Sequence, residues 1–182
     1  MSLLKLFGWG ADGAESAPRG GAAETATVRE IIEQLDHLEP ERARYIAAFA
    51  YILSRVAHAD MEISDEETRT MERIVIEQGG LPEEQALIVV QMAKTQNLLF
   101  GGTENYLVTR EFNRLADREQ KTALLRCLFA VSAADETVST VEDNVIRQIT
   151  TELRLEHADF IELRSEFRDY LGVLRQSDDP AE

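Results

Sequence analysis

Apolar residues recur every three or four positions along most of the chain, which is the spacing of one face of an α-helix. The widest apolar face falls between 41 and 57 and indicates a central helix covered by its neighbours. Its members are Tyr45, Ile46, Phe49, Ile52, Leu53 and Val56. No segment shows sustained alternation of apolar and polar residues between turn signals. The pattern therefore predicts an all-α protein.

Proline, glycine and capping residues divide this pattern into separate helices. Pro40 suits the first turn of the central helix, and Gly79-Gly80 ends the helix that comes after it. Asp117, with Gln120 three residues later, predicts the N-cap of a helix that extends to Val131. Further helices are expected over 25–38, from 64, from 82 to about 97, over 104–116, from 139, and through the apolar residues of 160–174. We therefore expect a compact bundle of about seven to eight helices.

One motif occurs twice, with Asp60 in the first copy and Asp135, 75 residues later, in the second. Other residues on both sides of the two aspartates align at the same offset. The aligned pairs are Leu53 with Leu128, Val56 with Val131, Ile63 with Val138, Ser64 with Ser139, Glu67 with Glu142, Met71 with Ile146, and Ile74 with Ile149. The repeat predicts two equivalent helix–turn–helix units, and so a pseudo-twofold internal repeat within the bundle.

The serine and the glutamate of each copy have the spacing of a capping box. In a capping box the serine hydroxyl accepts a hydrogen bond from the N3 amide, and the glutamate accepts one from the serine amide. Ser64 with Glu67, and Ser139 with Glu142, would then open two helices, while the aspartates before them bind amides of the turn. One cap contributes about 0.5–2 kcal/mol to stability, which is reason enough for a purely structural role.

The same turns also indicate a cation site. Acidic residues gather in both turns with no basic residue among them. A turn would bring the carboxylates of Asp60 and Glu67 close to each other and to backbone carbonyls, and the second turn holds acids that include Asp135 and Glu142. Ca²⁺ or Mg²⁺, bound weakly, is the cation that such oxygen ligands favour. The Asp-x-Asp-x-Asp-Gly pattern of an EF-hand is absent, and capping alone and capping with cation binding both remain open.

The charge balance narrows the choice of partners. The chain has 182 residues, with 19 Lys and Arg against 34 Asp and Glu, and a formal net charge of −15. Such a chain repels nucleic-acid phosphates, so we expect no nucleic acid among its partners and favour cations or basic proteins.

The chain has a single cysteine, Cys127, which excludes an internal disulfide. Cys127 lies among leucines, so we expect it to be an inert core residue.

The two ends of the chain differ from its helical part. Residues 1–9 form a short apolar peptide, and residues 10–24 form a flexible linker rich in Gly and Ala. The helical domain is assigned to 25–176 and an acidic tail to 177–182. Three roles are open for the apolar peptide: it packs on its own domain or stays disordered, it docks on a protein partner, or it makes a peripheral contact with a membrane. No stretch has the roughly 18 apolar residues of a membrane-spanning helix.

These residues resemble the TerB-like family, which includes the tellurite-resistance TerB proteins. The family pattern Ala-Asp-Gly-x-(Ile/Val)-Ser-x-x-Glu matches 59–67 and 134–142 except at its glycine, where Met61 and Glu136 stand. The resemblance covers about 28–174 and implies an all-helical, non-enzymatic domain of a bacterial stress response. It also implies metal binding, a cytoplasmic location with complexes at the inner face of the membrane, and a contact role for the four acidic residues named above.

Two classes of function follow. The first is a binding or scaffold domain that a divalent cation tunes. The alternative is a metal-dependent hydrolase, which needs the clustered carboxylates to converge in a concave pocket. No nucleophile–base pair can be named, because Cys127 lies on an apolar face. The histidines also lack the Glu-x-x-His spacing of a di-iron bundle. We therefore favour the non-enzymatic class.

Overall fold

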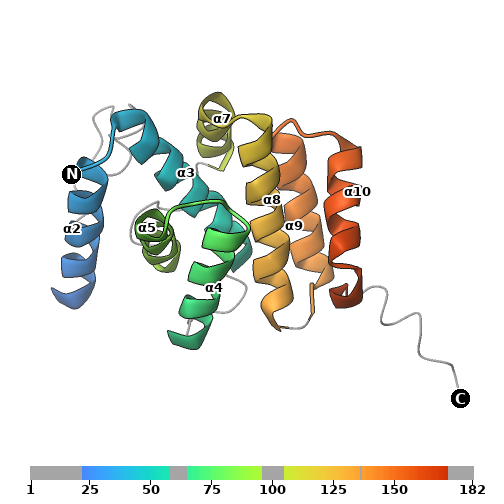
Figure 1. The fold of residues 1–182 in the computed structure, drawn as a ribbon, viewed down its shortest axis with the longest axis horizontal. Coiled ribbons are helices and arrows are strands. Elements are labelled where there is room, and N and C mark those ends of the chain that lie inside the picture. Colours follow the sequence, from blue (N-terminus) through green and yellow to red (C-terminus); the bar gives the residue numbers. More distant parts are fainter. Residues whose placement is uncertain (1–21, 58–64, 96–104, 136, 172–182) are drawn as a thin grey trace, which may run out of the picture.

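The computed structural model describes residues 22–57, 65–95, 105–135 and 137–171, which form a helical bundle (Figure 1). Among these residues the one strand-like contact is an isolated parallel bridge between Val138 and Leu171. The α-helices are α2 (Ala22–Asp36), α3 (Pro40–Ala57), α4 (Asp65–Glu77), α5 (Glu83–Lys94), α7 (Asn105–Leu115), α8 (Arg118–Ser132), α9 (Thr140–Glu152) and α10 (His157–Glu166), and the 3-10 helices are η1 (Ala133–Asp135) and η2 (Arg168–Tyr170). The prediction of an all-α bundle is therefore confirmed.

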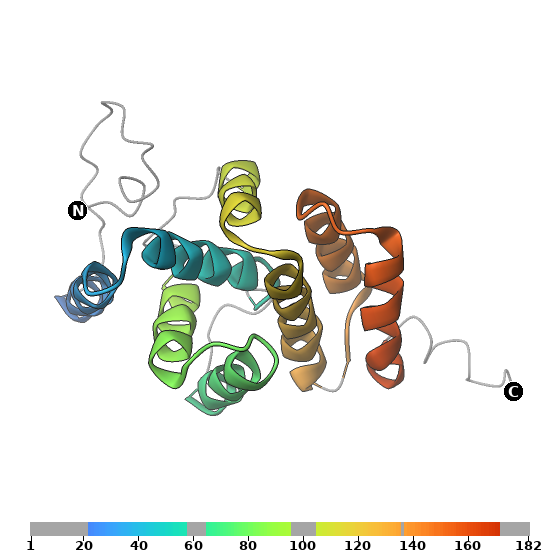
Figure 2. The same ribbon diagram turned by 45° about the horizontal axis from the view of Figure 1, so that its top comes forward.

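Helix α3 occupies the centre of the bundle, as its wide apolar face predicts. It packs against α2, α5, α7, α8 and α9, and in Figure 2 it crosses between α7 on one side and α5 on the other. Twelve of its 18 residues are buried, including the aromatic residues Tyr45, Phe49 and Tyr51. Burial on so many sides removes apolar surface from water, which is the main favourable contribution to folding.

The repeated motif corresponds to a repeated pair of helices. Helices α3 and α8 end 75 residues apart, and α4 and α9 both begin and end 75 residues apart. Aligned positions such as Leu53 and Leu128, or Met71 and Ile146, are buried in both copies. The neighbours differ, however: α4 packs against α5 and α8, whereas α9 packs against α8 and α10 and also against α3 and α7 (Figure 1). The copies therefore share their helix bounds but differ in their tertiary contacts.

Capping and glycine residues end several helices as predicted. Asp117 and Gln120 form the expected capping box at the start of α8. Gly79 and Gly80 follow α4 for different reasons. A Cβ on Gly79 would lie 2.5 Å from the carbonyl oxygen of Val75 and 3.1 Å from Cys127 Sγ, so glycine allows α4 to end close against α8. Gly80 has a φ of +63°, a left-handed conformation that glycine adopts without strain.

The end of the last helix is where the sequence prediction is wrong. The apolar pattern of 160–174 predicts one helix, but α10 ends at Glu166. Phe167 has φ −105° and ψ 19°, η2 follows, and Leu171 is extended. Leu171 pairs with Val138 and is buried there, so the turn uses an apolar side chain that helical spacing assigns to α10. Two other bounds differ slightly, since α2 begins at Ala22 and not near 25, and α5 ends at Lys94 and not near 97.

The chain ends singled out by composition are largely outside the described residues. These are the apolar peptide 1–9, most of the linker 10–24 and the acidic tail 177–182, whose roles stay predictions. In the part of the chain that the structure describes, no helix combines the length and apolarity needed to cross a membrane.

Candidate functional site

The turn between α8 and α9 carries the second copy of the motif. After α8 the chain forms η1, and Val138 then leads to the start of α9. Ser139 is the N-cap: its Oγ accepts a hydrogen bond from the Glu142 amide at 3.2 Å, and its own amide donates to Glu142 Oε2 at 2.8 Å. The capping interpretation is therefore confirmed for this copy, and Glu142 has a structural role at the start of α9.

The next acid along, Asp143, is buried against basic side chains. Only 5 % of Asp143 is exposed. Arg164 of α10 donates from Nε to Asp143 Oδ1 at 2.8 Å, and Arg147 Nη2 lies 3.8 Å from Oδ2. Two guanidinium groups thus balance the carboxylate that α9 places in its interface with α10. This acid of the second turn holds the two helices together.

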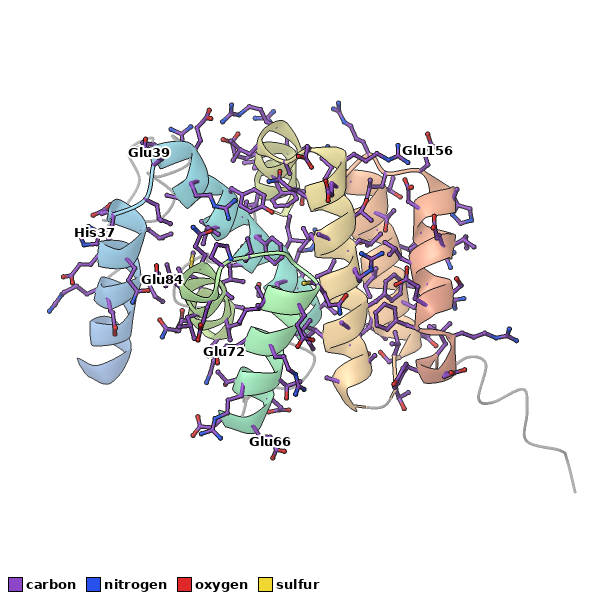
Figure 3. All side chains as sticks on the ribbon, viewed as in Figure 1. His37, Glu39, Glu66, Glu72, Glu84 and Glu156 are labelled. Atoms are coloured by element: carbon purple, nitrogen blue, oxygen red, sulfur yellow. The ribbon has the colours of Figure 1, made fainter. Side chains whose placement is uncertain are left out.

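The first copy of the motif is described from Asp65 onward, because Asp60 and Ser64 lie outside the described residues. Glu67 is exposed in the first turn of α4, and the neighbouring Glu66 points away from the bundle (Figure 3). The described start of α4 therefore faces solvent. The hydrolase alternative needs acids that converge in a concave pocket, and this end of α4 does not support it.

The structure places the four candidate ligands unequally. It describes the side chains of Glu67 and Glu142, in the first turns of α4 and α9, and the backbone of Asp135 in η1. Asp60 lies outside the described residues. Within the described ranges, no group of three or more His, Cys, Asp or Glu residues is arranged to hold a metal ion. A cation site at these turns stays a prediction.

A largely buried ion pair that no local sequence pattern reveals joins three helices. Arg55, in the last turn of α3, donates from Nη1 to Glu152 Oε2 at 2.6 Å and from Nη2 to Oε1 at 3.1 Å. Thr109 of α7 and Gln148 of α9 donate to the same carboxylate at 3.0 Å and 2.8 Å. These four side chains are termed the Arg55–Glu152 clamp. They tie α3, α7 and α9 to one another.

The clamp keeps Glu152 ionised although the residue is largely buried. Burial alone would raise the pKa of Glu152, because a carboxylate loses its hydration. The hydrogen bonds and the charge of Arg55, with the bonds from Thr109 and Gln148, outweigh burial and hold the pKa of Glu152 below its usual value. One sequence feature could have pointed to this pair: Arg55 is a charged residue in a helix whose apolar face predicts burial on most sides. Its partner is 97 residues away, so local spacing could not locate it.

Cys127 is a core residue, as the sequence predicts. It is fully buried, and its Sγ lies 3.6 Å from the carbonyl oxygen of Ile74. Burial raises the pKa of the thiol to about 12, so the thiol is protonated at neutral pH. The core position of Cys127 is therefore confirmed, and its burial supports the expectation of an inert thiol, because the thiolate is the reactive form.

The fold defines an all-α domain built on a repeated helix pair, with a capped turn before the second helix of the second pair. The family model for tellurite resistance protein TerB matches residues 46–165, from within α3 to the last turn of α10. The chain therefore belongs to the TerB family, and both copies of the motif lie inside the match. Neither the curated proteins nor the solved structures that were searched gave a significant match.

Proposed function

We propose that this chain is a non-enzymatic binding or scaffold domain that serves a tellurite-resistance-like stress response. The observation that carries this proposal is that the polar groups inside the bundle pair with one another and hold helices together. Arg55 pairs with Glu152 and Arg164 with Asp143 across helix interfaces, while Cys127 is kept as a buried thiol. These groups stabilise a scaffold, whereas the first turn of α4 carries its acids on the outside. Membership of the TerB family supports the link to stress.

The partner that fits the negative charge of this chain is a protein with a basic face. A net charge of −15 attracts positive charge and repels nucleic-acid phosphates. The exposed acids at the start of α4, Asp65, Glu66 and Glu67, form one such contact surface. The apolar peptide 1–9 is the second contact in this proposal. It anchors the domain to the same partner, in the cytoplasm or at the inner face of the membrane.

Deleting residues 1–21 keeps α2 intact from Ala22 and should abolish capture of the partner that the full chain pulls down.

The charge contact has its own test: Asp65→Asn with Glu66→Gln should weaken capture at low salt more than at high salt, because salt screens exposed charges. Unchanged capture by both variants would contradict this proposal. Binding to phospholipid vesicles that the deletion abolishes would assign the peptide to a peripheral membrane contact instead.

We also propose that the acidic turns bind a divalent cation, Ca²⁺ or Mg²⁺, weakly. The candidate ligands are Asp60 and Glu67 in the first turn, and Asp135 and Glu142 in the second. A carboxylate has two oxygens, so Glu142 can keep one on the Ser139 amide and offer the other to a cation. The combination of carboxylates and backbone carbonyls at a turn supports this assignment, because hard cations prefer oxygen ligands.

Titrating Ca²⁺ or Mg²⁺ to about millimolar concentration should shift the backbone amide resonances of both turns in a saturable way. Asp60→Asn should abolish the shift at the first turn. Glu142→Gln should abolish it at the second turn without losing the helix start, since glutamine also completes a capping box. The matched control is Ser139→Ala, which costs about 0.5–2 kcal/mol of stability through loss of the cap but keeps every carboxylate. Wild-type spectra that do not change would rule the site out.

A further inference from the structure

The chain after α10 folds back onto the segment that leads into α9. Val138 donates its amide hydrogen to the carbonyl oxygen of Tyr170 at 2.6 Å, and Val138 and Leu171 form a parallel bridge. The side chains of Val138 and Leu171 are buried and pack together with Ala133. Residues 167–171 are termed the strap. The strap therefore covers the backbone just before the Ser139 cap.

Few groups attach the strap to the domain. Ala133, Val138 and Leu171 form a small apolar cluster that is distinct from the main core, and Phe167 packs against both. The ring of Phe167 stacks on Phe129 with the centroids 5.6 Å apart. The residues between Phe167 and Leu171 are all exposed. Beyond Phe167, the strap is held by this small separate cluster, and such a segment opens at a lower free-energy cost than the helical core.

We propose that the strap is a releasable element that opens without unfolding the bundle and, when closed, holds the second acidic turn in one conformation. Closure fixes Val138 next to Ser139, between η1 and the first turn of α9. Glu142 belongs to that first turn, so the strap fixes the described backbone of 137–139 that leads into the Ser139 cap.

The strap also regulates cation binding at that turn, an extension that rests on the proposed function. A turn held in one conformation loses less freedom when it binds a ligand, so a closed strap should raise the affinity for the cation. By linkage, a bound cation should favour the closed strap by the same factor. The turn before α4 is an internal control, because α4 lies on the other side of α8 from the strap (Figure 1).

Hydrogen exchange on the full chain tests the release of the strap. Leu171→Ala removes the side chain that closes the small cluster, so the Val138 amide should exchange at least about tenfold faster. Core amides such as that of Phe49 should keep their wild-type protection. The matched control is Tyr170→Ala, in which the exposed side chain is removed but the carbonyl that accepts the bond remains. It should leave the exchange of Val138 unchanged.

Two results would overturn a releasable strap. One is a Val138 amide that exchanges equally fast in the wild type and in Leu171→Ala. The other is a Leu171→Ala chain in which core amides lose protection together with Val138, or which fails to fold, because the strap would then belong to the main bundle. Exchange of the wild type in dilute denaturant gives an independent measure. Val138 should open with a smaller dependence on denaturant than Phe49, since less surface is exposed.

Cation titration separates this proposal from the one on which it rests. Leu171→Ala should weaken Ca²⁺ or Mg²⁺ binding at the second turn by about fivefold or more, and leave the first turn unchanged. Equal affinity at the second turn in both chains would overturn the coupling. A wild-type chain that binds neither ion would remove the cation site and the coupling with it, while the exchange of Val138 would still decide whether the strap opens by itself.

Discussion

Replacing Glu152 with alanine is expected to lower the free energy of unfolding by about 3–5 kcal/mol. The substitution removes the acceptor of both Arg55 nitrogens and leaves a guanidinium whose side chain is only 8 % exposed without its partner. Thr109 and Gln148 lose the same acceptor. A buried charge without a partner is costly, because the interior does not replace its hydration. Chemical denaturation at neutral pH measures the loss.

A double substitution separates pairing from packing at the clamp. Arg55→Met with Glu152→Leu replaces the ion pair with apolar side chains and should recover most of the lost stability, because a buried pair contributes little net stability relative to apolar packing. A double variant as unstable as Glu152→Ala would show that the unpaired charge is not the cause. A loss below about 1 kcal/mol in the single variant would show that the pair is solvated in solution.

The clamp also predicts the direction of a pH dependence. The pKa of Glu152 in the folded chain lies below the ordinary value of 4.5. The stabilisation from this lowered pKa is therefore complete above the ordinary pKa and is lost as the pH falls through the folded one. The gap in the free energy of unfolding between the wild type and Glu152→Gln should shrink over that acidic range. A gap that stays constant with pH would mean that Glu152 does not titrate differently in the folded chain.

Phe112→Ala should cost about 3–5 kcal/mol, because it opens a cavity between α7 and the central helix. The ring of Phe112 is fully buried. It stacks on Tyr45 with the centroids 5.2 Å apart and meets Phe49 edge-on at 6.2 Å. Such aromatic pairs add about 0.5–1.5 kcal/mol each beyond the burial of their area. Chemical denaturation measures the cost, and near-ultraviolet circular dichroism reports the loss of aromatic packing.

Val141→Ala is the control for the core substitution. Val141 is 71 % exposed in the first turn of α9, so its truncation should change stability by no more than about 0.5 kcal/mol. A cost at Phe112 as small as the cost at Val141 would mean that α7 is not closed on α3 in solution. Equally large losses of about 3–5 kcal/mol at both sites would instead point to an effect on the unfolded state.

The starts of helices follow from the sequence because capping is a local interaction. Asp117 and Gln120, and likewise Ser139 and Glu142, are three residues apart and form the capping boxes that their spacing predicts. The repeated helix pair follows for a related reason, since apolar positions at helical spacing mark the same faces in both copies. Within the candidate site, the sequence therefore predicts the capping role of Glu142.

Contacts between distant segments did not follow from the sequence. The apolar spacing of Leu171 fits a continued helix as well as it fits a turn, and its contact with Val138 decides between them. Arg55 and Glu152 each look like an ordinary charged residue near a helix end, and only the approach of α3 to α9 makes them a pair. The sequence alone could not show that Asp143 would be neutralised by Arg164, because that contact depends on how α10 packs on α9.

The order of amino acids by itself determined an all-α domain, the limits of most of its helices and the capped start of α9, because periodicity and capping act within a few residues. Only the tertiary structure decided which charges are buried in pairs and which face solvent, where the last helix stops, and that the strap lies on the segment before α9. Those outcomes depend on segments far apart in the chain, and their free energies arise only when the helices pack.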